Sequence, residues 1–326
     1  FKPRKALQYK PISGGTSSQG AGYFTASNPE FGALITYYLP EGYTSKKTKR
    51  QKIEKTLKKE NKNIPFPGWD ALDKENNEIE ASIRFIIKDA NGNFVDKIEG
   101  VNKKGVNRTA WNLKKQIIAS VDIDKIDKPS SINTFVDPGT YNVTMYEDVN
   151  GNVKQLGTTQ FFEVERIRQN VLENPNKNMI DGYIKDLTAL KLDVNTLTNR
   201  FNDASKKATA FKKALNYITT DPGDLELEVN TLLETMQSLK QMLNGYASKD
   251  EVGEKDTPTL SSRISVAQNG LNGGTYGPTK MHMESYEIAK ELYNRLKPKM
   301  DQFISTDIHK VEKLLREAGV PIIISD

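Results

Sequence analysis

The longest regular pattern of apolar residues lies in the second half of the chain, between residues 180 and 218. The apolar or small positions are Ile180, Tyr183, Leu187, Leu190, Val194, Leu197, Phe201, Ala204, Ala208, Phe211, Leu215 and Ile218. Most residues between them are Lys, Asp, Asn, Thr or Arg. A spacing of about 3.5 residues sustained over this length is the seam of an amphipathic helix packed against other helices. The pattern therefore predicts one helix of roughly 55–60 Å.

A second seam with the same spacing follows a Pro-Gly break at residues 221–224. Its apolar positions are Leu225, Val229, Leu232, Met236, Leu239, Leu243 and Tyr246. Two such helices joined by a short turn predict an antiparallel helical hairpin. A shorter helix should open at Thr257-Pro258, and a last long helix should begin near Thr279 and be kinked or interrupted at Pro298. Residues 166–326 are thus predicted to form an antiparallel helical bundle.

The first half of the chain follows a period of two instead. Residues 138–146 alternate apolar and polar side chains, as a half-buried strand does. Asn-Gly pairs at 91–92 and 150–151 supply the positive φ angles that tight hairpins need. Residues 114–136, rich in Asp, Lys, Pro and Ser, are expected to form a long loop. Short strands joined by turns predict an antiparallel Ig-like or fibronectin-like β-sandwich over residues 23–165.

The two periods divide the 326 residues into parts. Residues 1–22 end in a Gly- and Ser-rich run that is typical of a flexible linker. The predicted organisation is this linker, the sandwich over 23–165 and the helical bundle over 166–326. The fold class is therefore α+β and multidomain.

The basic charge of the chain is concentrated in one predicted insert of the sandwich, residues 45–62. It carries nine Lys and Arg residues against two Glu residues, a net +7, and the whole chain carries +5, which leaves −2 for the remainder. The composition favours a helix, on which only Ile53 and Leu57 share an apolar face. The candidate patch for an anionic partner comprises Lys46, Lys47, Lys49, Arg50 and Lys52. The alternative is a solvent-exposed insertion without a ligand.

A nucleic-acid partner is not expected. The basic residues are confined to this insert, whereas nucleic-acid-binding domains carry a basic face. The insert also has no aromatic residues between its lysines on which bases could stack.

The residue types needed for catalysis are scarce. The chain has no cysteine and only two histidines, His282 and His309, which leaves little material for a catalytic triad or a metal site. The loops at 89–93 and 148–152 begin like a calcium-binding loop but lack Gly at its sixth position and Glu at its twelfth. We therefore predict no catalytic residue, no metal site and no cofactor.

Trp69 and Trp111 are the two candidate ligand-binding aromatics, because exposed rings can stack on sugars. The alternative for either is a place in the core of the sandwich, where large aromatic side chains are usual. Trp69 lies in a Pro-rich loop predicted over 65–70, and Trp111 lies centrally in a predicted strand over 107–113.

The order of motifs along the chain resembles the region that follows the β-propeller in sortilin-like, BNR-repeat proteins of Bacteroidetes type, often labelled glycosyl hydrolases. The residues that carry the resemblance are 20–29, Phe31-Gly32-Ala33, 35–39, 65–70, 89–93, Gly105 with Arg108, Trp111-Asn112-Leu113, 138–141 and 277–279. The resemblance implies an exported protein, periplasmic, outer-membrane-associated or extracellular, of which this chain is a C-terminal piece. Any hydrolase activity implied by the family label would belong to the N-terminal propeller.

The favoured hypothesis is a non-catalytic scaffolding or interaction module of such a protein, whose partner is another protein or its own β-propeller. The first alternative is a carbohydrate-binding module accessory to a glycoside hydrolase. The second is a hydrolase in its own right, which requires two facing carboxylates of opposed pKa in a cleft. No run of eighteen apolar residues occurs, so no transmembrane segment is predicted.

Overall fold

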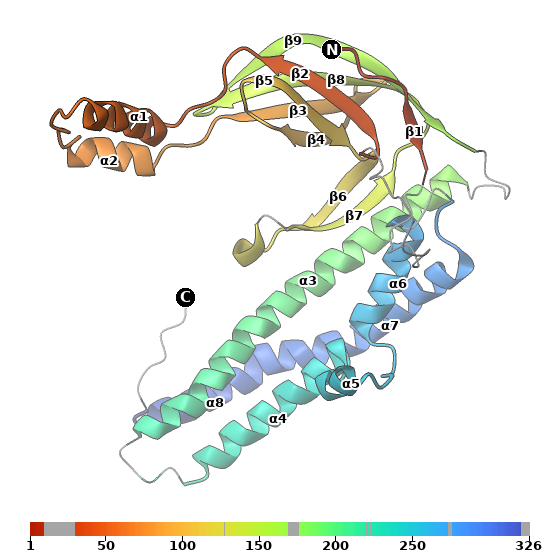
Figure 1. Ribbon diagram of the computed structural model, residues 1–326. Coiled ribbons are helices and arrows are strands. Elements are labelled where there is room, and N and C mark those ends of the chain that lie inside the picture. The colour runs from red at the N-terminus through yellow and green to blue at the C-terminus, as the bar shows by residue number, and fades with distance from the viewer. Residues whose placement is uncertain are drawn as a thin grey trace, which may run out of the picture. The chain divides into compact units, whose positions relative to one another are not determined.

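The protein is a mixed α+β chain of two compact units (Figure 1). The computed structural model describes residues 1–9, 30–126, 128–168, 176–218, 221, 223–272 and 276–320. The first unit, here termed the sheet unit, comprises Phe1–Gln116 and Thr134–Val171. The second, the helical unit, comprises Ile117–Asn133 and Leu172–Asp326. Most of the linker predicted over 1–22 and the apolar segment 322–324 lie outside the described residues.

The sheet unit contains a five-stranded sheet and a two-stranded ladder. The order in the larger sheet is β1-β9-β8-β3-β4, with β1 parallel to β9 and the other pairs antiparallel. Its strands are β1 (Ala6–Gln8), β3 (Ser82–Asp89), β4 (Phe94–Gly100), β8 (Gly139–Val149) and β9 (Asn152–Arg166). The ladder pairs β2 (Ala33–Leu39) with β5 (Gly105–Trp111) in antiparallel register.

Both predicted hairpin turns are confirmed. The first Asn-Gly pair joins β3 to β4, with Gly92 at φ 83°, and the second joins β8 to β9, with Asn150 at φ 54° and Gly151 at φ 83°. Alternate residues of the strands point into one hydrophobic cluster. Its fully buried members include Ala33, Ile83, Ile87, Trp111 and Leu113.

A helical pair is inserted between β2 and β3. It consists of α1 (Lys46–Lys59) and α2 (Trp69–Asn76), which lie beside each other (Figure 1). The Ser45 side chain caps α1 by accepting a hydrogen bond from the Thr48 amide at 3.1 Å. The prediction of a loop over residues 65–70 is wrong for its last two residues, because α2 begins at Trp69. None of the residues of α2 is buried, so no apolar period marks this helix in the sequence.

The expected long loop over 114–136 is also wrong. This segment forms a two-stranded hairpin of β6 (Lys114–Ser120) and β7 (Ser130–Phe135), with a short 3₁₀ turn over Ile123–Lys125 between them. The polar residues that suggested a loop lie mostly around the 3₁₀ turn, and the strands on either side of it are short.

The helical unit is built on the predicted long helix, which is confirmed as α3 (Lys177–Ala214) followed by a 3₁₀ turn over Leu215–Tyr217. Every seam residue from Tyr183 to Leu215 is buried. The remaining helices are α4 (Leu225–Asn244), α5 (Ala247–Val252), α6 (Leu260–Asn272), α7 (Lys280–Gln302) and α8 (Ile308–Glu317). Helix α3 contacts α4, α6, α7 and α8, and one hydrophobic cluster runs along it.

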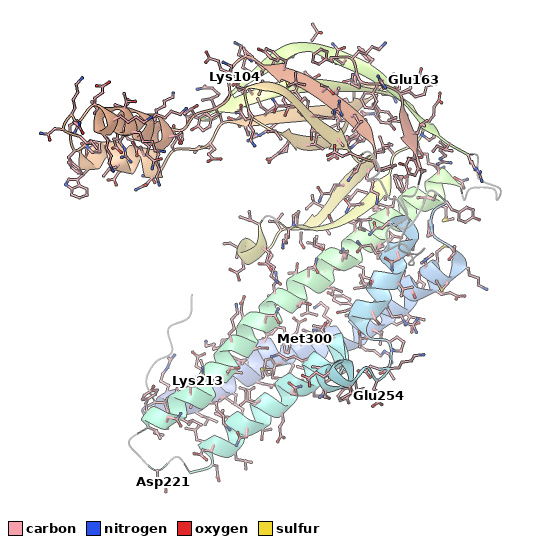
Figure 2. All side chains as sticks on the ribbon, in the orientation of Figure 1. Lys104, Glu163, Lys213, Asp221, Glu254 and Met300 are labelled. Atoms are coloured by element: carbon pink, nitrogen blue, oxygen red, sulfur yellow. The ribbon has the colours of Figure 1, made fainter. Side chains whose placement is uncertain are left out.

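Two predicted helix boundaries are corrected. Helix α6 begins at Leu260 rather than at Thr257-Pro258, because Thr259 supplies the cap: its Oγ1 accepts a hydrogen bond from the Ser262 amide at 3.3 Å. Pro298 does not interrupt α7. Leu296 and Met300 on either side of it are buried among the helices, and this packing outweighs the hydrogen bond that proline cannot donate (Figure 2).

A π-helical turn over Phe303–Asp307 then joins α7 to α8. No helix within the described ranges combines the length and the apolar character needed to cross a membrane.

Candidate functional site

The insert is held together by one charged cluster that joins its two helices. Arg50 donates from Nη1 to Glu54 Oε1 at 2.6 Å, from Nε to Glu75 Oε1 at 2.8 Å and from Nη2 to Glu75 Oε2 at 2.9 Å. These bonds from Arg50 keep the pKa of Glu75 below its usual range. Arg50, which the sequence places in the candidate anionic-partner patch, is therefore occupied by the fold of the insert itself.

The lysines of α1 do not take part in this charged cluster. All seven are exposed, and within the described residues none forms an ion pair through its ammonium group. They are Lys46, Lys47, Lys49, Lys52, Lys55, Lys58 and Lys59. The only carboxylate on α1, Glu54, is bonded to Arg50. The helix therefore carries seven ammonium groups without an ion pair, and the charge of one of them, Lys47, also acts on Glu75.

Exposed apolar side chains gather at one end of the insert. Trp69 is 75% exposed, and its ring contacts that of Phe66 edge-to-face, with centroids 4.9 Å apart. Because α1 follows β2 and α2 precedes β3, the segment joining the two helices lies at the end opposite these strands. This end, here termed the insert tip, includes the exposed residues Lys58, Lys59, Glu60, Lys62, Ile64, Phe66 and Trp69, and Lys62 Nζ lies 2.7 Å from Glu60 Oε2.

Trp111, the other candidate ligand-binding residue, does not lie at the surface. Its side chain is fully buried, and its Nε1 donates to Asp96 Oδ2 at 3.0 Å and to the Lys114 carbonyl at 3.1 Å. The rings of Tyr141 and Phe162 pack around the indole. The indole therefore leaves no open face for a sugar, and the candidate ligand-binding role of Trp111 is wrong. Burial of Asp96 raises the pKa of its carboxyl group.

A second exposed surface lies in the segment that the sequence presented as a loop. The connection between β6 and β7, with the end of β6, exposes the aliphatic side chains of Ile118, Val121, Ile123 and Ile126, and Ile123 is 87% exposed. We term residues 118–126 the hairpin tip. The sequence signal that could have revealed it is the repeated Ile and Val between Asp and Lys residues.

The hairpin is fixed to the helices by polar side chains of α3 and α6. Lys191 donates from Nζ to the Ser131 carbonyl at 3.1 Å and to Gln268 Oε1 at 2.6 Å. Gln268 in turn donates from Nε2 to the same carbonyl at 3.1 Å. Asn195 donates from Nδ2 to Ser120 Oγ at 2.9 Å. The surroundings of Lys191 bury its ammonium group, which lowers its pKa.

Two further contacts complete this attachment. The Asn133 amide donates to Asn272 Oδ1 at 3.1 Å. Ile132 is fully buried in the hydrophobic cluster of the helical unit, and Ile117 packs against that cluster. Both strands that flank the hairpin tip are therefore attached to the helices.

Two cavities of the sheet unit are lined without acidic residues. One, of about 280 Å³, is lined by residues of β2, β3, β8 and β9, most of them apolar. The other, of about 500 Å³, is lined by the cations Lys2, Arg4, Lys5 and Arg108 with apolar neighbours. Neither provides the facing carboxylates that a hydrolase needs. Among the described residues, no group of three or more His, Asp or Glu residues is placed to hold a metal ion.

Comparison with known protein families and with curated proteins finds no match for this chain. The resemblance to sortilin-like proteins therefore stays a prediction. Of the predicted site residues, the structure brings Trp69 and the four lysines onto one exposed insert, engages Arg50 within that insert and buries Trp111.

Proposed function

We propose that the chain is a non-catalytic interaction module of a larger exported or cell-envelope protein, with a β-propeller preceding it. Its finer architecture under this proposal is an Ig-like sandwich followed by an antiparallel helical bundle with a long helical hairpin. The observation that carries the proposal is the hairpin tip, which holds exposed aliphatic side chains on a fixed base.

The hairpin tip has the anatomy of a protein-binding surface. Its exposed aliphatic side chains are interleaved along the chain with the charged residues Asp122, Asp124, Lys125 and Lys128. Contiguous exposed apolar patches are uncommon on proteins that act alone, and an apolar centre with a polar rim is typical of interfaces. The hydrogen bonds of Lys191, Gln268 and Asn195 order this segment before binding, which lowers the entropy lost on association.

The partner that fits this surface is a protein with an apolar recess. Aliphatic side chains gain free energy by leaving water in such a recess. The charged residues among them are of both signs and give no preference for an anionic surface, so we favour the protein's own propeller or a separate protein as the partner.

The experiment places a photo-crosslinking amino acid at Ile123 and, as a matched control, at Leu227, which is also largely exposed but lies on α4. We expect a discrete adduct with a defined protein or with the upstream domain from position 123 and none from 227. The purified partner should then bind the wild-type chain and lose about 30-fold in affinity with Ile123→Asp, as at an interface hot spot. Identical adduct patterns at both positions, or unchanged affinity, would refute the proposal.

Carbohydrate binding is a second candidate function, favoured by the exposure of Trp69 beside Phe66. An exposed indole offers a face on which a sugar ring can stack. Affinity electrophoresis in polysaccharide gels should then retard the wild-type chain and not Trp69→Ala. Equal migration of both in all gels would remove this candidate.

A further inference from the structure

We propose that the insert is a peripheral membrane-docking element whose tip binds the surface of a bilayer rich in anionic lipids. This inference concerns the sheet unit and is independent of the protein partner proposed for the hairpin tip. Three features of the insert carry it: its unneutralised lysines, its exposed rings and the self-contained charge cluster that holds its helices together.

The lysines supply the electrostatic attraction. Seven ammonium groups lie on the 14 residues of α1 without an ion pair in the described part of the chain. Basic residues close to an anionic leaflet each strengthen binding by about fivefold, and clusters of about four to eight such residues are typical of segments that bind anionic lipids. The long alkyl stems let the ammonium groups reach headgroup phosphates from different sides of the helix.

The exposed rings supply the second contribution. Trp69 and Phe66 lie in contact at the insert tip, with Ile64 nearby in sequence, at the end of the pair where α1 finishes in Lys58 and Lys59. Tryptophan is enriched at membrane–water interfaces because its ring is apolar and its N–H is polar. The rings can therefore enter the interfacial layer while the adjacent lysines contact the phosphates.

The bonds between the two helices of the insert leave the ammonium groups of α1 available. Arg50 bonds both Glu54 and Glu75, and within the described residues none of the seven lysines forms an ion pair. Asp70 and Asp73 on α2 are exposed and carry the opposite charge. The tip must therefore approach the headgroups with its α1 side closer to them than the side of α2 that carries these aspartates.

Other anionic partners fit this surface less well. The centres of protein interfaces are depleted in lysine, whereas lysine dominates α1. Single-stranded nucleic acids are bound by aromatic rings placed along a basic groove. Here the rings are gathered at one end, and α1 itself has no aromatic residue.

The experiment uses the full chain and vesicles of phosphatidylcholine with about 30 mol% phosphatidylglycerol, compared with vesicles of phosphatidylcholine alone. We expect co-sedimentation with the anionic vesicles and loss of binding at about 0.5 M salt. Of the two tryptophans, one is exposed on the insert and the other is fully buried, so a blue shift of fluorescence reports the insertion of Trp69. Trp69→Ser should abolish the shift.

Two variants that each lose four positive charges distinguish the contribution of the insert from that of lysines elsewhere in the chain. The test variant carries Lys→Gln at Lys49, Lys52, Lys55 and Lys59. The matched control carries Lys→Gln at the exposed residues Lys213, Lys255, Lys290 and Lys299 of the helical unit. We expect the test variant to lose at least about 100-fold in vesicle partitioning and the control to bind as the wild type does. The helical content of both should equal that of the wild type.

Three results would overturn the inference. The first is equal binding to neutral and anionic vesicles, and the second is an equal loss in both variants. The third is tight binding to poly-L-glutamate with no fluorescence shift on vesicles, which would assign the insert to an acidic protein instead.

Discussion

Replacing Lys191 with Met tests whether the hairpin tip is held by buried polar bonds. In the wild type, Lys191 bonds the Ser131 carbonyl at 3.1 Å and Gln268 Oε1 at 2.6 Å. Methionine keeps a long, unbranched apolar stem but lacks the ammonium group. The substitution therefore removes both bonds and leaves the packing of the stem largely intact.

Two effects of opposite sign determine the size of the loss. A hydrogen bond to a charged group contributes about 1.5–3 kcal/mol, but removing a half-buried charge recovers part of the cost of its desolvation. The Ser131 carbonyl keeps its bond from Gln268 Nε2, so the main new defect is Gln268 Oε1 without its donor. We expect a net loss of about 1–2 kcal/mol in the free energy that opens the hairpin from the helices.

The loss should grow with pH. Burial lowers the pKa of Lys191 in the folded chain below the ordinary value of 10.5. In the window between the two pKa values the unfolded chain binds more protons, so the wild type gains stability as the pH rises through it. The methionine variant has no such gain. The difference between the two should therefore be larger near pH 10 than at about pH 7.

Hydrogen exchange of peptides within residues 117–133 measures this opening directly. Lys185→Met is the matched control, because Lys185 is exposed on the same helix. Lys191→Met should speed exchange in this segment by about 5- to 30-fold, and Lys185→Met should not. Equal exchange in the two variants would refute the idea that Lys191 anchors the hairpin.

Five other substitutions test the packing of the two units. Phe201→Ala removes a fully buried ring and should cost about 3–5 kcal/mol in urea unfolding, whereas Leu192→Ala, at an exposed site on the same helix, should cost far less. Gly270→Ala should lower the free energy of unfolding by about 1–3 kcal/mol, because its new methyl group would lie 2.7 Å from a histidine ring of α7. Gly182→Ala, which has open space around it, should instead stabilise α3 by about 0.5–1 kcal/mol. Burial raises the pKa of Asp96, so the wild type should gain stability as the pH falls from 7 through that raised pKa; Asp96→Asn should lack this gain in unfolding measurements.

The long helix could be predicted because its signal is repeated many times. Each turn of α3 places another residue in the core, from Tyr183 to Leu215, so the period is visible without knowledge of the partners. The Asn-Gly turns were predictable for a local reason, since few residues adopt positive φ angles without strain.

The hairpin of β6 and β7 could not be predicted in the same way. Its strands have seven and six residues, and only Ile132 among them is buried, so no alternation is visible. Its attachment depends on residues far away in the chain, such as Gln268, which is 137 positions from Ser131. A sequence pattern records burial along a segment, whereas here the bonds to distant helices determine the structure.

The two candidate tryptophans show the same limit of prediction from local sequence. Both are large aromatics near turns or strands, and local sequence favours neither burial nor exposure. Trp111 is buried because β5 faces the ring-bearing strands β8 and β9, and its N–H finds Asp96. Trp69 is exposed because it opens α2, a helix with no buried residue.

The two exposed surfaces differ in the charge around their apolar residues, and this difference separates their partners. Asp122 and Asp124 belong to the hairpin tip together with Lys125, and they add to the larger effect of Asp203 in raising the pKa of Lys206. At the insert tip the exposed rings occur at the end where α1 finishes in Lys58 and Lys59. An anionic bilayer is attracted by the lysines of the insert and not by the mixed charges of the hairpin tip. Ile123→Asp should therefore leave vesicle binding unchanged, and neutralising the α1 lysines should leave crosslinking at position 123 unchanged. Loss of both activities in either variant would mean that one shared partner covers both surfaces.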